Sequence, residues 1–219
     1  MAGAVVADEQ RVDKPGTLIA TQAHIRLKAG ARSPYVSRGG QKLEGGLTAF
    51  DVEVTGVVAL DVGASTGGFA DCLLQRGATK VFAVDVGYGQ LAWSLRQDPR
   101  VVNMERCNIR SLSPDGLSPT PSLAVIDASF ISLKLVIPHV VRLIAPKGEI
   151  VALVKPQFEV GKGRVGKGGV VRDPALHEEV LSHLQAQADT WQVSVKGVTE
   201  SPLLGPKGNK EFLLYLQKC

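Results

Sequence analysis

Val57-Val-Ala-Leu-Asp-Val-Gly-Ala-Ser-Thr-Gly-Gly-Phe69 is the stretch of sequence that decides the fold. Its first part, Val57–Asp61, is a continuous apolar run that ends on a carboxylate, as in a buried strand of a parallel sheet. Gly63 permits a tight turn after that strand. Gly67 and Gly68 let a ligand approach the backbone where the next helix begins. The stretch therefore predicts a strand, a ligand-binding turn and a helix, in that order.

Strand and helix patterns alternate on the C-terminal side of this turn. Helices are predicted at Gly67–Arg76, at about Gln90–Arg96, at Ile131–Ile144 and, behind the N-cap Asp173 and Pro174, to about Thr190. Strands are predicted at Val81–Asp85, Val101–Met104, Leu123–Asp127, Glu149–Lys155, Gln192–Val198 and Phe212–Gln217. This alternation predicts an α/β fold, a doubly wound sheet with helices on both faces.

The first 30 residues have a different pattern. Val5-Val6, Gln10–Val12, Leu18–Ala20 and His24–Leu27 are short β-type runs separated by polar turns. Residues 29–34 read as a linker. We therefore expect a small β-rich unit at residues 1–31 and the α/β domain at residues 32–219.

The glycine turn has the features of a nucleoside site. Asp85 ends the next strand, 24 residues after Asp61, where a carboxylate can accept both ribose hydroxyls; Asn108 follows the third strand and could pair with an adenine edge. The turn is neither Gly-x-Gly-x-x-Gly nor a phosphate-binding loop, and its acidic first position favours S-adenosylmethionine over NAD. A structural turn without a ligand is the alternative. The predicted cofactor-binding residues are Asp61, Gly63, Ala64, Ser65, Thr66, Gly67, Gly68, Phe69, Asp85, Val86, Asn108 and Asp127.

Four ionisable residues fall at or near the ends of predicted elements. Asp127 and Lys155 end consecutive strands, so both should reach the crevice beside the glycine turn. Glu211 precedes the last strand, and Lys42 opens a helix before the first strand. Each of them, taken alone, could be an ordinary surface charge. Lys155 differs because it directly follows a wholly apolar strand, which places it at the edge of the sheet. Together they predict a site that can remove a proton from a hydroxyl.

The charge distribution suggests a polyanionic partner. The net charge is +4 and the pI about 9.0, and residues 155–172 contain five cations and one anion. A solvated loop would have the same composition. The candidate phosphate contacts are Arg38, Lys162, Arg164 and Lys167.

Several classes of protein are disfavoured. Three cysteines without a Cys-x-x-Cys pair suit the reducing cytoplasm, and four scattered histidines give no metal-site spacing. The first residues lack the pattern of a signal peptide, and no apolar run approaches the length of about 20 residues that a membrane-spanning helix needs. We expect a cytoplasmic protein that binds neither metal nor membrane. The sequence carries no signal for an oligomeric state.

Five motifs in order resemble a known family. They are Tyr-Val-Ser-Arg-Gly-Gly-Gln-Lys42, Asp61-Val-Gly-Ala-Ser-Thr-Gly-Gly-Phe, Asp85-Val-Gly-Tyr-Gly-Gln-Leu, Ser129-Phe-Ile-Ser-Leu and Lys155-Pro-Gln-Phe-Glu-Val-Gly. Residues 35 to 217 thereby resemble the TlyA-type ribosomal RNA 2′-O-methyltransferases of the FtsJ-like superfamily.

The resemblance implies a Rossmann-like class I methyltransferase with a seven-stranded sheet whose last strand is antiparallel. It implies S-adenosylmethionine as the donor and cytidine riboses of ribosomal RNA, in the ribosomal subunits, as targets. It also implies a Lys-Asp-Lys-Glu tetrad, with Lys155 as the base, Lys42 and Glu211 as positioning groups, and Asp127 near the sulfonium.

The N-terminal residues resemble only the second half of an S-four type RNA-binding domain, without its two leading helices. Three other functions remain open at this point. The first is membrane activity, because members of the family are also labelled haemolysins. A non-catalytic, S-adenosylmethionine-binding factor for ribosome assembly is another, and methylation of a different RNA is the third.

Overall fold

The computed structural model describes residues 5–12, 17–27, 33–161 and 163–219. The chain divides into two units, Met1–Pro34 and Tyr35–Cys219, where the sequence suggested a boundary near residue 32. Each unit has its own sheet.

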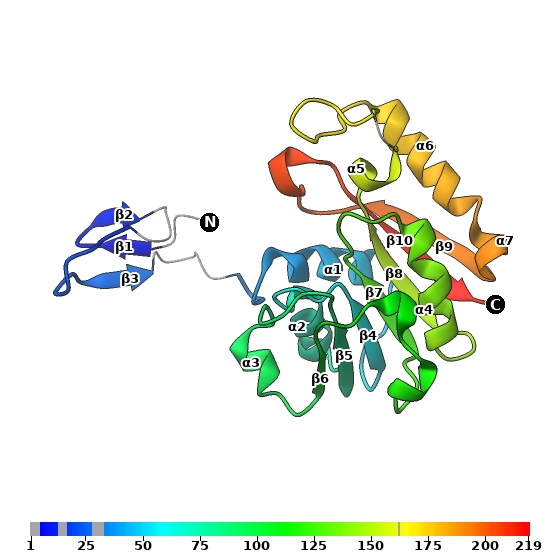
Figure 1. The fold of residues 1–219 in the computed structure, drawn as a ribbon, viewed down its shortest axis with the longest axis horizontal. Helices are drawn as coiled ribbons and strands as arrows, with labels where there is room; N and C mark the ends of the chain where they lie inside the picture. Colours follow the sequence, from blue (N-terminus) through cyan, green and yellow to red (C-terminus); the bar gives the residue numbers. More distant parts are fainter. Residues whose placement is uncertain (1–4, 13–16, 28–32, 162) are drawn as a thin grey trace. The chain divides into compact units, whose positions relative to one another are not determined.

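The first unit contains a three-stranded antiparallel sheet in the order β2-β1-β3 (Figure 1). Its strands are β1 (Val5–Ala7), β2 (Gln10–Val12) and β3 (Ile25–Leu27). Asp8 and Glu9 form the tight turn between β1 and β2, and Glu9 pairs with Arg26 of β3. The strand expected at Leu18–Ala20 is wrong, because this segment is irregular and the side chain of Leu18 is 98% exposed.

The second unit is built on a seven-stranded sheet in the order β6-β5-β4-β7-β8-β10-β9. β4 (Val58–Val62), β5 (Lys80–Val84), β6 (Val101–Met104), β7 (Leu123–Ile126) and β8 (Glu149–Val154) are parallel. β10 (Phe212–Lys218) lies between β8 and β9 (Val193–Glu200) and is antiparallel to both. The expected α/β fold, with a mixed seven-stranded sheet and an antiparallel last strand, is confirmed.

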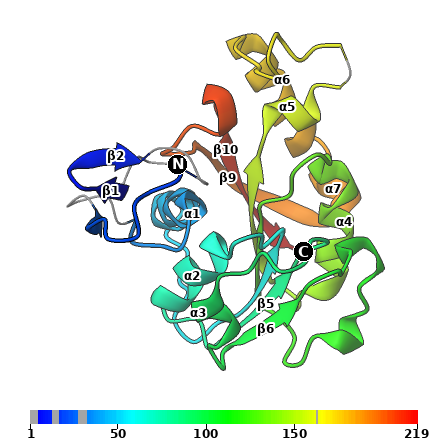
Figure 2. The same cartoon turned by 60° about the vertical axis from the view of Figure 1, so that its left-hand side comes forward.

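Side chains alternate between the two faces of this sheet, as the two-residue period of a strand requires. In β4, Ala59 packs in the core on one face, and Leu60 and Val62 pack in the core on the other. The first face is covered by α1 (Arg38–Ala49), α2 (Gly68–Gln75) and α3 (Trp93–Arg96). The second is covered by α4 (Ile137–Leu143), α6 (Pro174–Gln185) and α7 (Ala188–Trp191). Figure 2 shows the two helical layers on either side of the sheet.

Three of the expected helices are shorter than the sequence suggested. The segment 131–144 contains a single 3₁₀ turn, η3 (Leu133–Leu135), and then α4. Pro138 explains the break, since it has no N–H and fits only the first turn of a helix. The helix expected from Gln90 begins at Trp93, because the N–H of Gln90 donates to the carboxylate of Glu105. The helix after Asp173 ends at Gln185 and is followed by α7.

The parallel strands present their carboxyl ends at one edge of the sheet, where ligands bind in folds of this kind. The glycine turn follows β4 there, Asp127 follows β7, and Lys155 follows β8 and leads into the short helix α5 (Pro156–Glu159). The remaining 3₁₀ turns are η1 (Ile109–Ser111), η2 (Pro114–Gly116) and η4 (Pro206–Gly208). Among the described residues, no helix has the length and apolar character needed to cross a membrane.

Candidate active site

The glycine turn between β4 and α2 is shaped by close approaches of other segments. Gly63 and Gly67 have φ of 85° and 93°, in the left-handed region that favours glycine. A Cβ on Gly63 would lie 2.7 Å from the carbonyl oxygen of Asp127, and one on Gly68 would lie 2.1 Å from Oγ of Ser37. The turn therefore accepts no side chain at these positions, and its backbone forms the floor of the site.

Two adjoining cavities open at this turn. The larger has a volume of about 520 Å³ and is lined by Asp85, Val86 and Asn108 along with residues that follow β7. The smaller, of about 270 Å³, is lined by Arg38, Lys42 and the glycine turn. Gly63, Ser65 and Asp127 line both cavities, so ligands bound in the two cavities would lie next to each other.

Asp85 and Asn108 reach the larger cavity and also hold its walls. The carboxylate of Asp85 accepts hydrogen bonds from the backbone N–H groups of Ser65 and Gly87, each at 2.7 Å. Oδ1 of Asn108 accepts from the N–H of Arg110 at 3.0 Å and caps η1. Each Asp85 oxygen keeps a second lone pair and Asn108 keeps its amide N–H groups, so both can still bind a nucleoside.

Asp61 lies beneath the glycine turn and is fully buried. Its two carboxylate oxygens accept no hydrogen bond of ordinary geometry, although the N–H of Ala70 is close enough to stabilise the charge in part. Burial raises the pKa of Asp61 well above its ordinary value, and the charge of Asp127 raises it further. A positively charged ligand bound at the turn would therefore stabilise the ionised form of this buried carboxyl group.

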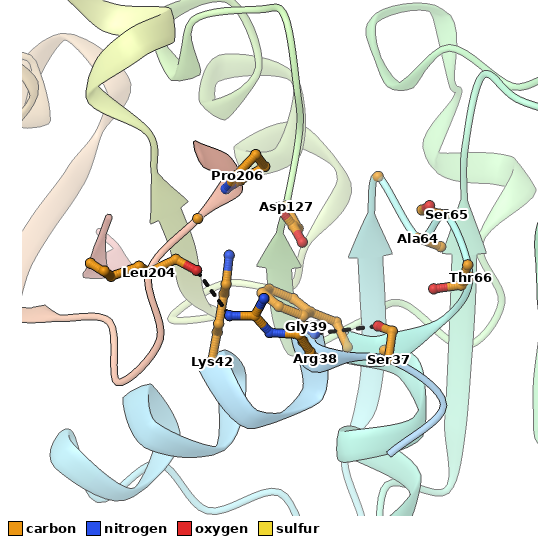
Figure 3. Close-up of a pocket in the computed structure, with 14 residues that line it drawn as sticks. Ser37, Arg38, Gly39, Lys42, Ala64, Ser65, Thr66, Asp127, Leu204 and Pro206 are labelled. Carbon is orange, nitrogen blue, oxygen red and sulfur yellow. Dashed lines mark hydrogen bonds between the residues drawn. The ribbon is translucent and has the colours of Figure 1, made fainter. Parts of the chain in front are cut away.

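The first ion pair of the site joins α1 to the segment before β10. Nζ of Lys42 lies 2.5 Å from Oε2 of Glu211, and the two residues are only 9% and 1% exposed. The other oxygen of Glu211 faces Gly205, where a Cβ would lie 2.0 Å from it. In Figure 3, Lys42 and Arg38 project from α1 into the smaller cavity, with Asp127 on the opposite wall.

The second ion pair joins the ends of β7 and β8. Nζ of Lys155 lies 2.5 Å from Oδ1 of Asp127 and donates a hydrogen bond to Oγ of Ser129 at 2.8 Å. Lys155 is 8% exposed, and the ring of Phe158 lies 6.0 Å from its Nζ. Asp127 therefore connects Lys155 to the cavity that Lys42 enters. The structure brings the four sequence-predicted ionisable groups together in two pairs, and one member of each pair, Lys42 and Asp127, lines the smaller cavity at the glycine turn.

The other cofactor residues proposed from the sequence have different environments. Ala64, Ser65 and Thr66 line the smaller cavity, and Ser65 donates to Oε1 of Gln90 at 3.2 Å. Val86 is largely exposed at the rim of the larger cavity. Phe69 is buried in the core beneath α1, with only an edge at the smaller cavity, so its role is mainly packing.

The proposed phosphate contacts are more scattered. Arg38 donates to the carbonyl oxygen of Leu204 at 3.2 Å, at the mouth of the smaller cavity (Figure 3). Arg164 forms a bidentate pair with Glu179 of α6, at 2.5 and 2.6 Å, a partner that the sequence did not reveal. Lys167 is exposed, and Lys162 lies outside the described residues.

Asn209 is a buried residue that the sequence reading missed. Its side chain donates to the carbonyl oxygens of Gly169 and Pro206 and accepts from the N–H of Val171, at 3.0 to 3.1 Å. Lys207 adds a hydrogen bond to the carbonyl oxygen of Gly168. The glycine-rich basic loop, residues 163–172, is thereby hydrogen-bonded to the segment that leads to Glu211. Asn209 stands two residues before Glu211 in the sequence, and this proximity to a member of the tetrad is the feature that could have indicated its role.

The sheet order, the glycine turn and the nucleoside-sized cavity define a class I, S-adenosylmethionine-dependent methyltransferase. The chain belongs to the FtsJ-like methyltransferase family, whose model matches residues 35–218. The 16S/23S rRNA (cytidine-2'-O)-methyltransferase TlyA of Mycobacterium tuberculosis is 48% identical over 216 residues, which are 99% of this chain and 81% of that protein. Hemolysin A of Brachyspira hyodysenteriae is 38% identical over 98% of this chain and 89% of its own length.

Solved structures agree with this assignment. A Streptococcus thermophilus protein described as a hemolysin is 48% identical and superposes with a TM-score of 0.86, over 100% of this chain and 80% of that one. An S-adenosylmethionine dependent methyltransferase from Mesorhizobium loti shares the fold at 14% identity, with a TM-score of 0.55 over 80% of this chain and 96% of that one.

The residues of the site fit S-adenosylmethionine. The larger cavity has the size of a small-molecule site and carries carboxylate and amide groups for a ribose and an adenine. Asp127 lines both cavities and can face a cationic donor, and the carboxyl of Asp61, whose oxygens have no hydrogen-bond partner, lies buried beneath the glycine turn. Among the described residues, no cluster of His, Cys, Asp and Glu could hold a metal ion.

Proposed function

We propose that this protein transfers the methyl group of S-adenosylmethionine to the 2′-hydroxyl of a ribose in ribosomal RNA, with cytidine as the target nucleotide. The observation that supports this most is the pair of lysine–carboxylate contacts, Lys42–Glu211 and Lys155–Asp127, beside the cavity with nucleoside-binding groups. The M. tuberculosis relative named for cytidine 2′-O-methylation supports the same acceptor.

The chemistry explains why such a site needs ionisable groups as well as a pocket. Methyl transfer is an in-line displacement, so holding donor and acceptor in line supplies much of the acceleration. A ribose hydroxyl is a weak nucleophile until its proton is removed or shared. S-adenosylmethionine, when bound, supplies an electrophilic methyl group on a positively charged sulfur. The protein has to supply orientation and a base.

We assign the base to Lys155. Its ammonium is nearly buried, and Asp127 holds it at 2.5 Å. In its neutral form, this amine can accept the proton of the acceptor hydroxyl.

Lys42 and Glu211 have a positioning role in this proposal. Glu211 neutralises Lys42 inside the protein and orients its Nζ at the smaller cavity, where the acceptor ribose would lie. Lys42 can donate hydrogen bonds to ribose oxygens.

RNA docking would use Arg38, which lines the smaller cavity, together with Arg164 and Lys167 of the basic loop that Asn209 fastens to the Glu211 segment. Lys162, which lies outside the described residues, is the remaining candidate from the sequence. The three-stranded N-terminal unit is our candidate for a further RNA contact, as part of an S-four type domain. A ribosomal RNA substrate would place the protein in the cytoplasm.

The direct test is methyl transfer to ribosomal subunits. Purified protein would be incubated with radiolabelled S-adenosylmethionine and 30S or 50S subunits from cells that lack this gene. We expect label in the ribosomal RNA, at a ribose that blocks primer extension at low nucleotide concentration. Label on a base, or label only in an RNA other than ribosomal RNA, would contradict the proposal.

A further inference from the structure

The contacts of Lys155 come from one short loop. Asp127 and Ser129 both follow β7, and they hold the Nζ of Lys155 at 2.5 and 2.8 Å. A second contact joins the two segments, because the ring of Phe130, although 91% exposed, lies on that of Phe158 with centroids 5.1 Å apart. Phe130 has φ of 62°, which is uncommon outside glycine and turns the chain sharply after Ser129. The buried contacts to Lys155 are therefore the main link between this loop and the Lys155 segment.

Ser129 also lines the larger cavity, which it shares with Asp127. Its hydroxyl is therefore at the boundary between the cofactor cavity and the buried ammonium. None of the roles derived from the sequence includes this residue, although it stands two positions after Asp127.

We propose that Ser129 is the positioning residue that orients the lone pair of Lys155, an inference that rests on the proposed ribose methylation. A neutral amine has two N–H bonds and one lone pair. Ser129 is the hydrogen-bond acceptor of Nζ, whereas the Asp127 carboxylate attracts Nζ as an ion-pair partner whose Oδ1 accepts no hydrogen bond. The Ser129 hydroxyl therefore fixes the direction of one N–H bond, and with it the direction of the lone pair. Without this hydroxyl, the amine could rotate about its Cε–Nζ bond and turn the lone pair away.

The proton and electron pairs balance in this arrangement. The 2′-oxygen forms its bond to the methyl carbon as the carbon–sulfur bond breaks, and the sulfur keeps that electron pair. The hydroxyl proton passes to the lone pair of Lys155, which becomes an ammonium and later loses the proton to solvent. Ser129 accepts a hydrogen bond from Lys155 before and after the transfer, and itself exchanges no proton.

The test compares Ser129→Ala with Ser129→Thr, which restores the hydroxyl. The rate is measured in single turnovers at saturating RNA and donor, and the donor affinity is measured by calorimetry. Misplacement of a reacting group typically costs about 100-fold, so we expect Ser129→Ala to lose about 10- to 100-fold in rate. The affinity for the donor should stay within about twofold of wild type, because Ser129→Ala changes the orientation of Lys155 and not the binding of the donor. Ser129→Thr should recover most of the rate, because it restores the hydroxyl.

Ser132→Ala is the matched control. It removes a hydroxyl from the same loop, but that hydroxyl donates to Glu159 at 2.6 Å and faces neither lysine of the tetrad. We expect a lower melting temperature without a comparable loss of rate.

A readout independent of turnover is the acylation rate of Lys155 by trace acetic anhydride, followed by mass spectrometry. Ser129→Ala frees Nζ of Lys155 from its hydrogen bond to the hydroxyl, so Lys155 should react several-fold faster, relative to Lys80 in the same protein. An unchanged rate and unchanged Lys155 reactivity in Ser129→Ala would overturn the inference. Loss of donor binding would overturn it as well, by making Ser129 a cofactor contact. A wild-type protein that does not methylate ribosomal RNA would instead refute the proposed function.

Discussion

Lys42 and Glu211 are 169 residues apart in the sequence, yet Nζ of Lys42 lies 2.5 Å from Oε2 of Glu211 inside the protein. The pair joins the first helix of the methyltransferase domain to the segment that enters its last strand. Two charges removed from water stabilise one another only as long as both are present.

Removing one member of this pair should therefore cost more than removing both. Lys42→Met or Glu211→Gln alone should lower the free energy of unfolding by about 3 kcal/mol, because each leaves a buried group unpaired. The double variant should be clearly more stable than the sum of the two losses predicts. Urea unfolding of the four proteins measures this coupling, and strict additivity would show that the two charges act independently.

Lys155→Ala should abolish methyl transfer without affecting donor binding. Loss of a general base costs about 100- to 10,000-fold, and the side chain does not line the cavity that carries Asp85 and Asn108. Lys80→Ala, at a distant strand where Nζ donates to the carbonyl oxygen of Ser118, removes the same charge and should keep its activity. Turnover at the wild-type rate in Lys155→Ala would remove Lys155 from its assigned role.

Asp61→Asn should stabilise the unliganded protein while weakening its affinity for S-adenosylmethionine. The pKa of Asp61 is raised in the folded state, so the native protein binds the extra proton and stability falls as the pH rises from about 4 through the raised value. The melting temperatures of the variant and wild type should converge near pH 4 and separate above it. The affinity should fall about fivefold, as expected for the loss of one ionic contribution of about 1 kcal/mol. Equal melting curves at all pH values would count against a buried, destabilising carboxyl.

Gly205→Ala should reduce methyl transfer through its effect on Glu211. A Cβ at this position would lie 2.0 Å from Oε1 of Glu211, so the carboxylate must move and Lys42 loses its partner. We expect a rate loss of at least about tenfold, since small displacements of reacting groups are costly. Gly208→Ala is a useful control because no atom lies within 4 Å of its added Cβ, although its φ of 85° adds some strain. Comparable rates in the two variants would contradict this explanation.

Glu179→Gln should strengthen RNA binding if Arg164 contacts phosphate. The bidentate pair between these residues occupies the guanidinium, and a phosphate has to compete with Glu179 for it. We expect an affinity gain of a few-fold, and a loss in Arg164→Ala with a salt-dependence slope smaller by about one. Glu178→Gln makes the same charge change at an exposed neighbour and serves as the control. Equal affinities for the two glutamine variants would remove Arg164 from the RNA surface.

Much of this architecture could be predicted from local patterns. The apolar strands, the glycine turn and the N-cap at Asp173 each follow from the chemistry of a few adjacent residues. The helix expected over 131–144 is wrong for an equally local reason, because Pro138 has no N–H and fits only the first turn of a helix. Leu18–Ala20 failed because a short apolar run carries little information without a partner strand.

The contacts between side chains in the site depend on tertiary structure, so the sequence alone could not predict them. That Arg164 meets Glu179 depends on how the basic loop docks on α6, and no spacing in the sequence encodes it. The same holds for Asn209, whose three partners lie on two different loops. Ser129 belongs to the motif Ser129-Phe-Ile-Ser-Leu, but only the direction of the Lys155 side chain shows that its hydroxyl accepts a hydrogen bond from Nζ.

The position of β10 has a consequence for the order of assembly. β9 reaches the sheet only through β10, and Glu211 is the residue immediately before that strand. Until β10 has inserted beside β8, the chain has neither a complete sheet nor a partner for Lys42. A molecule in which β10 has not yet paired with β8 therefore lacks a complete catalytic site. The site is completed only when this strand joins the sheet.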